Sequence, residues 1–496
     1  MSTNTKLILS AITFVLILAG LNSASFLPSY ILFYIITAGI LVAYGLLGLI
    51  DEKFDPSEDH WIKDPKILIA SGILFLSMVL FINSSFLNSE RLYKTLEVAD
   101  VNTSELTFEK HRSVTLAMAS KVANKILGQK IDGVQISSQY QLNTEMASVQ
   151  LVNDELLWII PLDYSSFAKW FSRDYIPGYV KISATNPRQA PELVTSFKMT
   201  ASQNAFSMDS IERIAYIESG LKNVKTHFEV DENGKPFFIS LVMVPSVVLS
   251  AQKVESVIVT DAQTKESIKV SVEDAQKEFP WIDQLVAEDY LEAQIEWYGE
   301  FAEGYWNTVF GGLNINKPTT YDGNELWFVK ANGRTMFFTG MTSNNNNDQS
   351  LVQGILVDTK TREAFSFDLS GVMDENGAIA AMNAALGANG ASSIKWHAVL
   401  PQPLMIDGVF YWGAAIVSKS NLFQRSALVK GNNAANVYIA TTYNKAIHLV
   451  KTKSVYSPDT DSKTSQDDET VTISRKKLDL ILKKVDELNS LVESFR

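Results

Sequence analysis

The sequence predicts an α+β protein with N-terminal transmembrane helices, repeated antiparallel-sheet-plus-helix units and a C-terminal coiled-coil helix. Three observations lead to this fold class. Long charge-free apolar runs are confined to residues 1–90, helical and strand-like patterns alternate through the middle of the chain, and residues 471–496 repeat apolar side chains at heptad spacing. The predicted order is a three-helix transmembrane anchor (1–89), a first α+β module (90–200), a second α+β module (201–310), a third, mainly β region (311–455), an acidic linker (456–470) and the coiled-coil helix (471–496).

The anchor is predicted from three stretches without a charged residue, Leu7–Pro28, Ile31–Ile50 and Ile67–Ser89. A helix of the length of Ile31–Ile50 spans about 30 Å, the thickness of a bilayer's hydrocarbon core. The first stretch is apolar only as far as Leu21, so a signal peptide is the alternative to an uncleaved first helix. No ionisable residue interrupts the stretches, which favours an anchor over an ion pathway. The polar residues that start at Asn83 mark the end of the third helix.

The topology follows from lysines in the short segments that flank these helices. Lys6 precedes the first helix, and Lys53, Lys63 and Lys66 lie between the second and the third, on the same side of the membrane. The positive-inside rule makes that side cytoplasmic. Three crossings then place everything after Ser89 outside, so we expect an integral, multi-pass protein with an extracytoplasmic soluble region.

The composition excludes several classes of function. The net charge of −12 and the absence of a basic cluster longer than Arg475–Lys477 argue against nucleic acid as a partner. The absence of cysteine removes disulfides, thiolate catalysis and zinc–thiolate sites. The expected partners are therefore the lipid bilayer and other protein chains.

The first module begins with an amphipathic helix and continues as strands. Residues 90–112 are polar and are predicted to connect the membrane to the helix Val114–Leu127. Ala147–Leu151 and Leu156–Leu162 flank Asn153-Asp154 and predict a hairpin, and Tyr179–Ala184 predicts a further strand.

Later segments continue the alternation of helices and strands. Val272–Trp306 is predicted to be helical with an interruption at Pro280-Trp281, and Ala378–Leu386 is a small-residue helix. Strands are expected from Lys395 to about Val450.

One turn pattern recurs along the folded region. Asn233-Gly234, Asn332-Gly333 and Asp407-Gly408 each precede a run rich in aromatic residues. Such turns place two residues at positive φ and start a strand.

A second recurring unit is a hairpin with the pattern Asp-x-x-Thr-(Lys/Arg)-Glu after a β-branched run. One copy contains Asp261 and Thr264, and the other, about 97 residues later, contains Asp358 and Thr361. The Asp side chain accepts hydrogen bonds from the backbone two residues on and nucleates the turn. We interpret the two copies as a duplication of an α+β unit.

These hairpins, which follow an aromatic strand and a helix, resemble the last hairpin of PepSY-type modules. That module is a small helix-plus-antiparallel-sheet unit of extracytoplasmic bacterial proteins, and its hairpin typically reads Asp-x-x-Thr-Gly-Glu/Lys. Here Lys265 and Arg362 replace the glycine. The resemblance covers at most residues 112–370, in pieces, and implies inhibition, regulation or scaffolding rather than catalysis.

The C-terminus predicts self-association. Tyr456–Thr470 is acidic and polar, as a flexible linker is. The helix after it carries an a/d seam, widened by Leu482 and Leu491 toward more than two strands; a helix docked on its own domain is the alternative. The seam residues are Leu478, Ile481, Val485, Leu488, Val492 and Phe495.

The sequence contains no standard catalytic or cofactor motif, so no cofactor and no catalytic or metal-binding residue is predicted. Its histidines (His60, His111, His227, His397 and His448) are isolated from one another. Ser166-x-x-Lys169 and Ser219-x-x-Lys222 match a nucleophile spacing that chance also produces. The acidic run at Asp374 is more typical of a solvated turn before a helix than of a cation site.

We therefore expect a non-enzymatic, membrane-anchored protein that presents an extracytoplasmic α+β region for binding or scaffolding and self-associates through its C-terminal coil. Two alternatives remain open. One is a PepSY-like regulator or inhibitor of an envelope peptidase, and the other is an accessory subunit of a membrane enzyme or channel complex.

Overall fold

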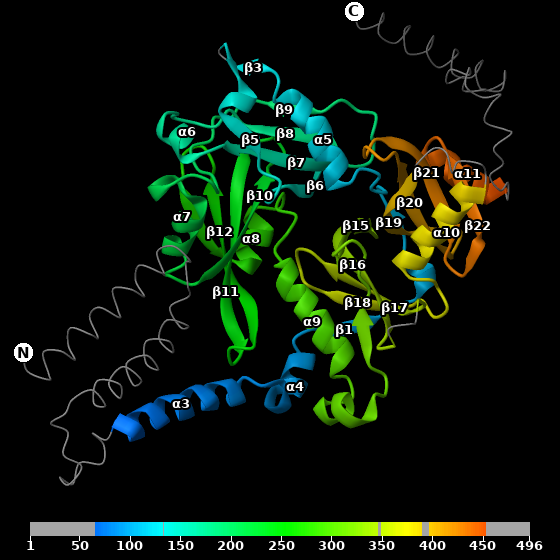
Figure 1. Ribbon diagram of the computed structural model, residues 1–496, viewed down its shortest axis with the longest axis horizontal. Coiled ribbons are helices and arrows are strands. Elements are labelled where there is room, and N and C mark those ends of the chain that lie inside the picture. The colour runs from blue at the N-terminus through cyan, green and yellow to red at the C-terminus, as the bar shows by residue number, and fades with distance from the viewer. Residues whose placement is uncertain (1–64, 132, 346–348, 389–395, 453–496) are drawn as a thin grey trace, which may run out of the picture. The chain divides into compact units, whose positions relative to one another are not determined.

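The computed structural model describes residues 65–131, 133–345, 349–388 and 396–452. They belong to one compact unit, and antiparallel pairing dominates their mixed α+β fold (Figure 1). The α+β class is thus confirmed for this part of the chain. The first two predicted membrane helices, the acidic linker and the coiled-coil seam lie outside the described residues, and the predicted domain boundaries stay a prediction.

The third predicted membrane helix is α3 (Pro65–Ile82), followed by α4 (Ser85–Tyr93). Among the described helices, one span, Ala70–Tyr93, is long and apolar enough to cross a membrane; it has a mean hydropathy of 1.9 and is 6% buried. The helix α3 ends before Asn83, as predicted. Its last carbonyls are satisfied by side chains, since Asn83 Nδ2 donates to Val79 O at 2.7 Å and Ser84 Oγ to Phe81 O at 2.6 Å.

Four units, named A to D, follow along the chain, each with a helix before an antiparallel sheet (Figure 1). Unit A contains α5 (Leu116–Ile126), β3 (Lys130–Ile131), β4 (Val134–Gln135), η3 (Ile136–Ser138), β5 (Tyr140–Leu142), β6 (Ser148–Val152), β7 (Glu155–Tyr164), α6 (Phe167–Phe171), β8 (Tyr179–Ser183) and β9 (Glu192–Val194). Unit B contains η4 (Ser207–Asp209), α7 (Ile211–Glu218), β10 (Asn223–Val230), β11 (Pro236–Val247), β12 (Ala251–Asp261), β13 (Ser267–Ser271) and α8 (Val272–Glu278).

Units C and D have the same order of helix and sheet. Unit C contains α9 (Glu288–Glu300), the π-helix η5 (Asn307–Gly311), β14 (Asn316–Pro318), β15 (Trp327–Ala331), β16 (Arg334–Ser343), β17 (Leu351–Asp358) and β18 (Ala364–Asp368). Unit D contains α10 (Glu375–Ala388), β19 (His397–Ile406), β20 (Val409–Val417), β21 (Phe423–Lys430), β22 (Asn433–Ala440) and α11 (Tyr443–Thr452).

Each sheet is built on a four-stranded meander. The meanders are β6-β7-β8-β9, β10-β11-β12-β13, β15-β16-β17-β18 and β19-β20-β21-β22. The helices α5, α7, α9 and α10 each contact the sheet of their own unit. Apolar residues of units A, B and C share one core, in which Ile160, Phe238 and Phe337 are buried.

One backbone hydrogen bond recurs in all four units. The residue directly after the third strand of each meander is small and buried, and its carbonyl accepts an N–H of the segment that enters the unit before its helix. We call this contact the entry bond; its N···O distance is 2.8 Å in every unit. The pairs are Ser113 to Ala184, Thr200 to Ala262, Leu285 to Thr359 and Met373 to Gly431.

The same four residues also close the sheets. Their N–H groups donate to carbonyls at the start of the second strand, at 2.9 to 3.2 Å, which are those of Leu156, Pro236, Thr335 and Phe410. A small side chain is needed because backbone passes on both sides. A Cβ on Gly431 would lie 2.9 Å from Phe410 Cδ1 and from Val372 Cγ1. The segment that enters each unit is thus joined, through the residue that follows the third strand, to the start of the second strand of the same sheet.

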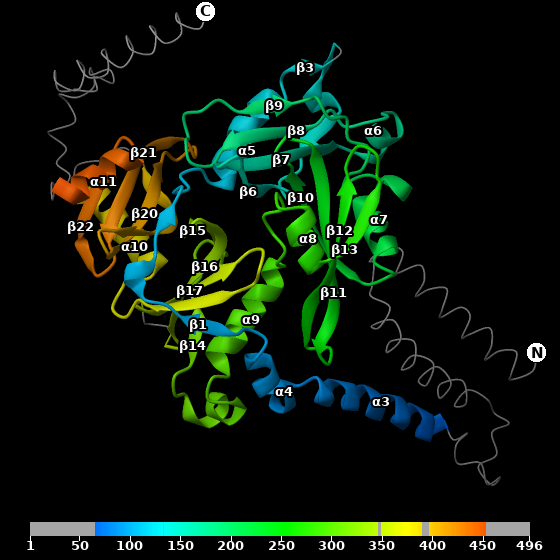
Figure 2. The ribbon, with the colours of Figure 1, turned by 180° about the vertical axis from the view of Figure 1, so that it is seen from behind.

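The segment predicted to be a polar connector instead enters the sheet of unit C. Between α4 and α5 lie β1 (Val98–Asp100), η2 (Thr103–Glu105) and β2 (Phe108–Glu109). Strand β1 pairs in parallel with β18, and β2 pairs with β15. In Figure 2, β1 is the blue strand beside the yellow strands of unit C. The polarity of this segment reflects its place at sheet edges, where alternate side chains face solvent.

Two further predictions were wrong in detail. Asn332 and Asp407 have positive φ as expected, but Asn233 does not; only Gly234 does. The hairpin at Asn233 is longer because Asp231 Oδ1 accepts the N–H groups of Asn233 and Lys235, both at 2.8 Å.

The last predicted strand is the helix α11, whose Ala446 and Val450 are buried four residues apart.

Candidate functional site

The repeated Asp-x-x-Thr hairpins form the third turn of units B and C with the same hydrogen bonds. Asp261 Oδ1 accepts the N–H of Gln263 at 2.7 Å and of Thr264 at 3.3 Å. Asp358 Oδ1 accepts the N–H of Lys360 at 2.8 Å and of Thr361 at 2.9 Å. In both turns the Thr Oγ1 accepts the N–H of the following Glu at 3.3 Å. The Asp and Thr side chains therefore hold the turn itself.

A cation from the first hairpin completes each turn. Lys235 Nζ lies 2.6 Å from Asp261 Oδ2, and Arg334 Nη1 lies 3.0 Å from Asp358 Oδ2. Hydrogen bonds and this ion pair lower the pKa of Asp261, although burial opposes them. The positions at which the PepSY-type pattern has glycine adopt φ 65° at Lys265 and 67° at Arg362. Glycine is typical there because it reaches positive φ without strain.

Unit C receives its entry segment at a buried polar junction. Thr359 Oγ1 donates to Asp283 O at 2.5 Å, and Lys360 Nζ lies 3.5 Å from Asp283 Oδ1. Leu151 N of unit A donates to Asp283 Oδ2, and Glu229 Oε2 of unit B accepts the N–H of Asp283 at 2.8 Å. Burial and the Glu229 carboxylate raise the pKa of Asp283 to about 7. The junction joins three units.

Other motifs from the sequence have structural roles. Ser219 Oγ donates to Tyr216 O at 2.7 Å and accepts the N–H of Lys222, whose Nζ lies 2.5 Å from Glu255. Ser166 is the N-cap residue of α6. Asp374 Oδ1 accepts the N–H of Gly377 at 2.7 Å, at the start of α10. The turn before this helix was expected to be solvated, but Asp374 and Glu375 are buried, at 7% and 1% exposure. Among the described residues, no group of three or more His, Cys, Asp or Glu side chains is arranged to hold a metal ion.

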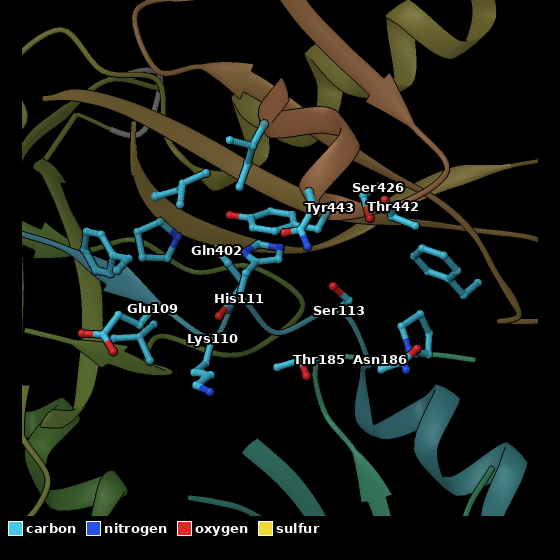
Figure 3. Close-up of a pocket in the computed structure, with 18 of the residues that line it drawn as sticks. Glu109, Lys110, His111, Ser113, Thr185, Asn186, Gln402, Ser426, Thr442 and Tyr443 are labelled. Carbon is cyan, nitrogen blue, oxygen red and sulfur yellow. The ribbon is translucent and has the colours of Figure 1, made fainter. Parts of the chain in front are cut away.

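The entry segment of unit A separates two cavities. The first is a cleft of about 570 Å³ between this segment and units A, C and D (Figure 3). Its charged lining residues Glu109, Lys110 and Arg188 have partners of their own. Lys330 Nζ lies 3.6 Å from Glu109, Lys110 Nζ lies 2.9 Å from Asp154, and Arg188 Nη2 donates to Thr441 O at 3.4 Å. Neutral polar residues such as Thr185 and Asn186 form the opposite wall, as Figure 3 shows.

His111 lines the same cleft. Its ring stacks on Tyr443 with centroids 3.9 Å apart and an interplanar angle of 4° (Figure 3). A Cβ on Gly413 would lie 2.6 Å from His111 Cε1, so glycine makes room for the imidazole. Burial, together with the neighbouring Arg112 charge, lowers the pKa of His111 to about 3. The neutral ring therefore fastens the entry segment to unit D.

Arg112 faces the second cavity, of about 890 Å³, which is lined by all four units. The side chain is 8% exposed, its Cζ lies 5.6 Å from the centre of the Trp158 ring, and its Nε has no hydrogen-bond partner. Within the described part of the chain, no carboxylate forms an ion pair with it. Burial lowers the pKa of Arg112 to about 10, which leaves the guanidinium charged at neutral pH.

Three acidic residues line the cavity, Glu145, Glu288 and Asp322, and Glu288 is the one whose charge interacts with that of Arg112. Glu288, at the start of α9, lines the cavity and accepts a hydrogen bond from Gln284 Nε2 at 3.1 Å. Burial raises its pKa, while Gln284, His227 and Arg112 oppose that rise. A buried guanidinium costs several kcal/mol unless it is paired, and a cation–π contact of about 0.5–2 kcal/mol offsets only part of this cost. An anionic group in the cavity would complete the site.

Comparisons with known proteins give no relative of this chain. No family model, no curated protein and no solved structure matches it. The described residues therefore define its class by themselves, a mixed α+β protein of antiparallel sheets with one helix suited to cross a membrane.

Sequence reasoning did not find His111 and Arg112. The pair lies in a polar stretch interpreted as a connector, where the run Lys110-His111-Arg112 is as typical of a solvated segment as of a site. The small residues of the entry bonds were equally hidden, because Ala, Thr and Gly at those positions share size but no pattern.

Proposed function

We propose that this protein is a non-enzymatic, membrane-anchored binding protein whose extracytoplasmic α+β region captures a carboxylate-bearing ligand. The observation that carries the proposal is Arg112, a charged guanidinium that is buried, faces a cavity of about 890 Å³ and has no carboxylate partner among the described residues. A bidentate carboxylate would satisfy the free N–H groups, and Trp158 would hold the guanidinium plane in place.

The test is calorimetric titration of the full chain in detergent with N-acetylated dipeptides that end in a free carboxylate, against the same peptides as amides. Arg112→Met should weaken binding of the acids about 10- to 150-fold, the loss of about 1.5–3 kcal/mol for a charge-assisted hydrogen bond. Arg188→Met is the matched control, because Arg188 is exposed and lines the first cleft. Equal binding of acids and amides, or equal losses in both variants, would contradict the proposal.

The second candidate function is regulation or inhibition of an envelope peptidase by tandem PepSY-like modules. It is favoured by the recurrence of one helix-plus-meander unit with the same entry bond in units A to D. We expect the full chain to slow such a peptidase. Ala262→Leu places a large side chain at a fully buried position of one entry bond and should weaken this effect. Unchanged hydrolysis in the presence of the full chain would count against the second candidate.

Anchoring and self-association complete the proposal. The chain has no cysteine, so Asn124→Cys, at an exposed position on α5, reports the side of the membrane through an impermeant maleimide. Labelling in intact cells is expected if the folded region is extracytoplasmic. Labelling only after lysis would place that region in the cytoplasm and contradict the predicted topology. Removal of residues 471–496 should lower the mass of the detergent-solubilised oligomer; an unchanged mass would exclude the coiled coil as its cause.

A further inference from the structure

The end of the membrane helix α3 is fixed to the folded region. Asn83 Oδ1 accepts the N–H of Leu249 at 2.6 Å, and Ser250 Oγ donates to Asn83 O at 2.5 Å, both from the turn between β11 and β12. Leu92 of α4 is 1% exposed and packs with Phe301 at the end of α9. The turn at Leu249 and the segment around Phe301 are therefore held close to the end of α3.

An apolar surface lies near the end of α3. Its side chains come from α4 and from the segment between α9 and β14, and Phe310 (80% exposed), Leu313 (67%) and Trp306 (59%) are the most exposed of them. We call this surface the aromatic patch. It consists of Phe86, Leu87, Trp306, Val309, Phe310 and Leu313.

The aromatic patch is continuous with the apolar surface of α3. Phe86 lies 6.2 Å from Phe81 of α3 and 5.5 Å from Trp306, measured between ring centroids. Trp306 stacks on Phe310 at 5.6 Å. A row of rings thus runs from the membrane helix to the π-helix η5, near the lower end of α9 in Figure 1.

We propose that the aromatic patch inserts into the lipid bilayer at the interface where α3 leaves it, as a second membrane contact of the folded region. Trp and Tyr favour this depth, and Phe and Leu on the same surface would reach the acyl boundary. Contact with lipid removes from water the large apolar side chains that are otherwise exposed.

The charges of the patch specify the kind of lipid surface. Residues 301–316 contain no Lys or Arg and one acidic residue, Glu303. On the α4 side of the patch, Arg91 is the one basic residue of the helix, and Lys94 just after it pairs with Glu90 at 2.6 Å, so no basic cluster forms. An electrostatic attraction to anionic lipids needs a basic cluster. The insertion is therefore hydrophobic and suits a zwitterionic surface such as phosphatidylcholine.

The cysteine-free chain permits a direct test by nitroxide labelling of single-cysteine variants of the full chain in phosphatidylcholine nanodiscs. At Phe310→Cys, we expect collisions with oxygen to exceed those with a water-soluble nickel chelate. Phe171→Cys is the matched control, because Phe171 is 79% exposed within another aromatic cluster, and it should show the reverse. Leu74→Cys, on α3 and 70% exposed, reports the anchor itself. Leu313→Cys replaces Phe310→Cys if that variant does not fold.

Each outcome decides the proposal. A lipid signature at Leu74 and Phe310 but not at Phe171 supports it, and it should persist when phosphatidylglycerol is added. High nickel accessibility at Phe310 with a lipid signature at Leu74 would overturn it and leave the anchor intact. Low accessibility to both reagents at Phe310 would mean that protein, for example a second copy, covers the patch, and would overturn insertion into lipid. A lipid signature at both Phe310 and Phe171 would show unspecific partitioning and would also overturn it.

Discussion

Truncation of Asp358 tests how the repeated hairpins stabilise their units. The side chain is 4% exposed, and its Oδ1 accepts two backbone N–H groups, at 2.8 and 2.9 Å. One donor, that of Thr361, belongs to an exposed residue and can bond to water after truncation. Hydrogen bonds to charged groups contribute about 1.5–3 kcal/mol, so we expect Asp358→Ala to cost about 2–3 kcal/mol of local stability.

The matched variant Asp358→Asn separates the turn from the ion pair. Its amide oxygen still accepts the backbone N–H groups, now as a neutral acceptor, while the ion pair with Arg334, which is 41% exposed, is lost. Such a pair contributes at most about 1 kcal/mol.

Hydrogen–deuterium exchange of the full chain in detergent measures both variants. The amide of Leu285, which makes the entry bond to Thr359, should exchange about 30- to 150-fold faster in Asp358→Ala, since each 1.4 kcal/mol is a factor of ten. In Asp358→Asn the change should stay below about fivefold. Equal acceleration in both variants would refute the role of the backbone hydrogen bonds and assign the stabilisation to the ion pair.

Three further predictions follow from the described contacts. Arg362→Gly should stabilise the protein by about 0.5–1 kcal/mol because φ is 67° there, whereas Lys253→Gly in β12 should destabilise it by a similar amount; thermal unfolding distinguishes the signs. The pKa of Asp283 is raised to about 7, above the value of about 3.9 in an unfolded chain, so the native state retains the proton and the free energy of unfolding falls as pH rises from about 4 to about 7. Asp283→Asn should flatten that slope in denaturant titrations, and an unchanged slope would exclude Asp283 as its source. Gly413→Ala should cost about 1–3 kcal/mol because its Cβ would meet the His111 ring, and His111→Ala should remove most of that penalty in a double-mutant cycle; additive losses would contradict the contact.

The local elements were predictable because their signals are local. The helix at 114–127 and the hairpin at Asn153-Asp154 follow from apolar periodicity and from turn residues that tolerate positive φ, and the structure has α5, β6 and β7 there. The end of α3 was equally clear from Asn83. The segment Tyr443–Val450 misled the prediction because short apolar runs fit both periods, and packing on β21 and β22 selected the helix.

The sequence by itself determined the apolar spans, the missing cysteine chemistry and the turns that begin each meander, since each depends on residues that are neighbours in the chain. Only the tertiary structure decided which distant segments meet. Residues 98–109 became edge strands of unit C because free backbone donors and acceptors at a sheet edge pair with any extended segment within reach. The same holds for the cavity at Arg112 and the aromatic patch. A buried charge and a row of rings arise when several elements pack together, and no short stretch of sequence encodes that meeting.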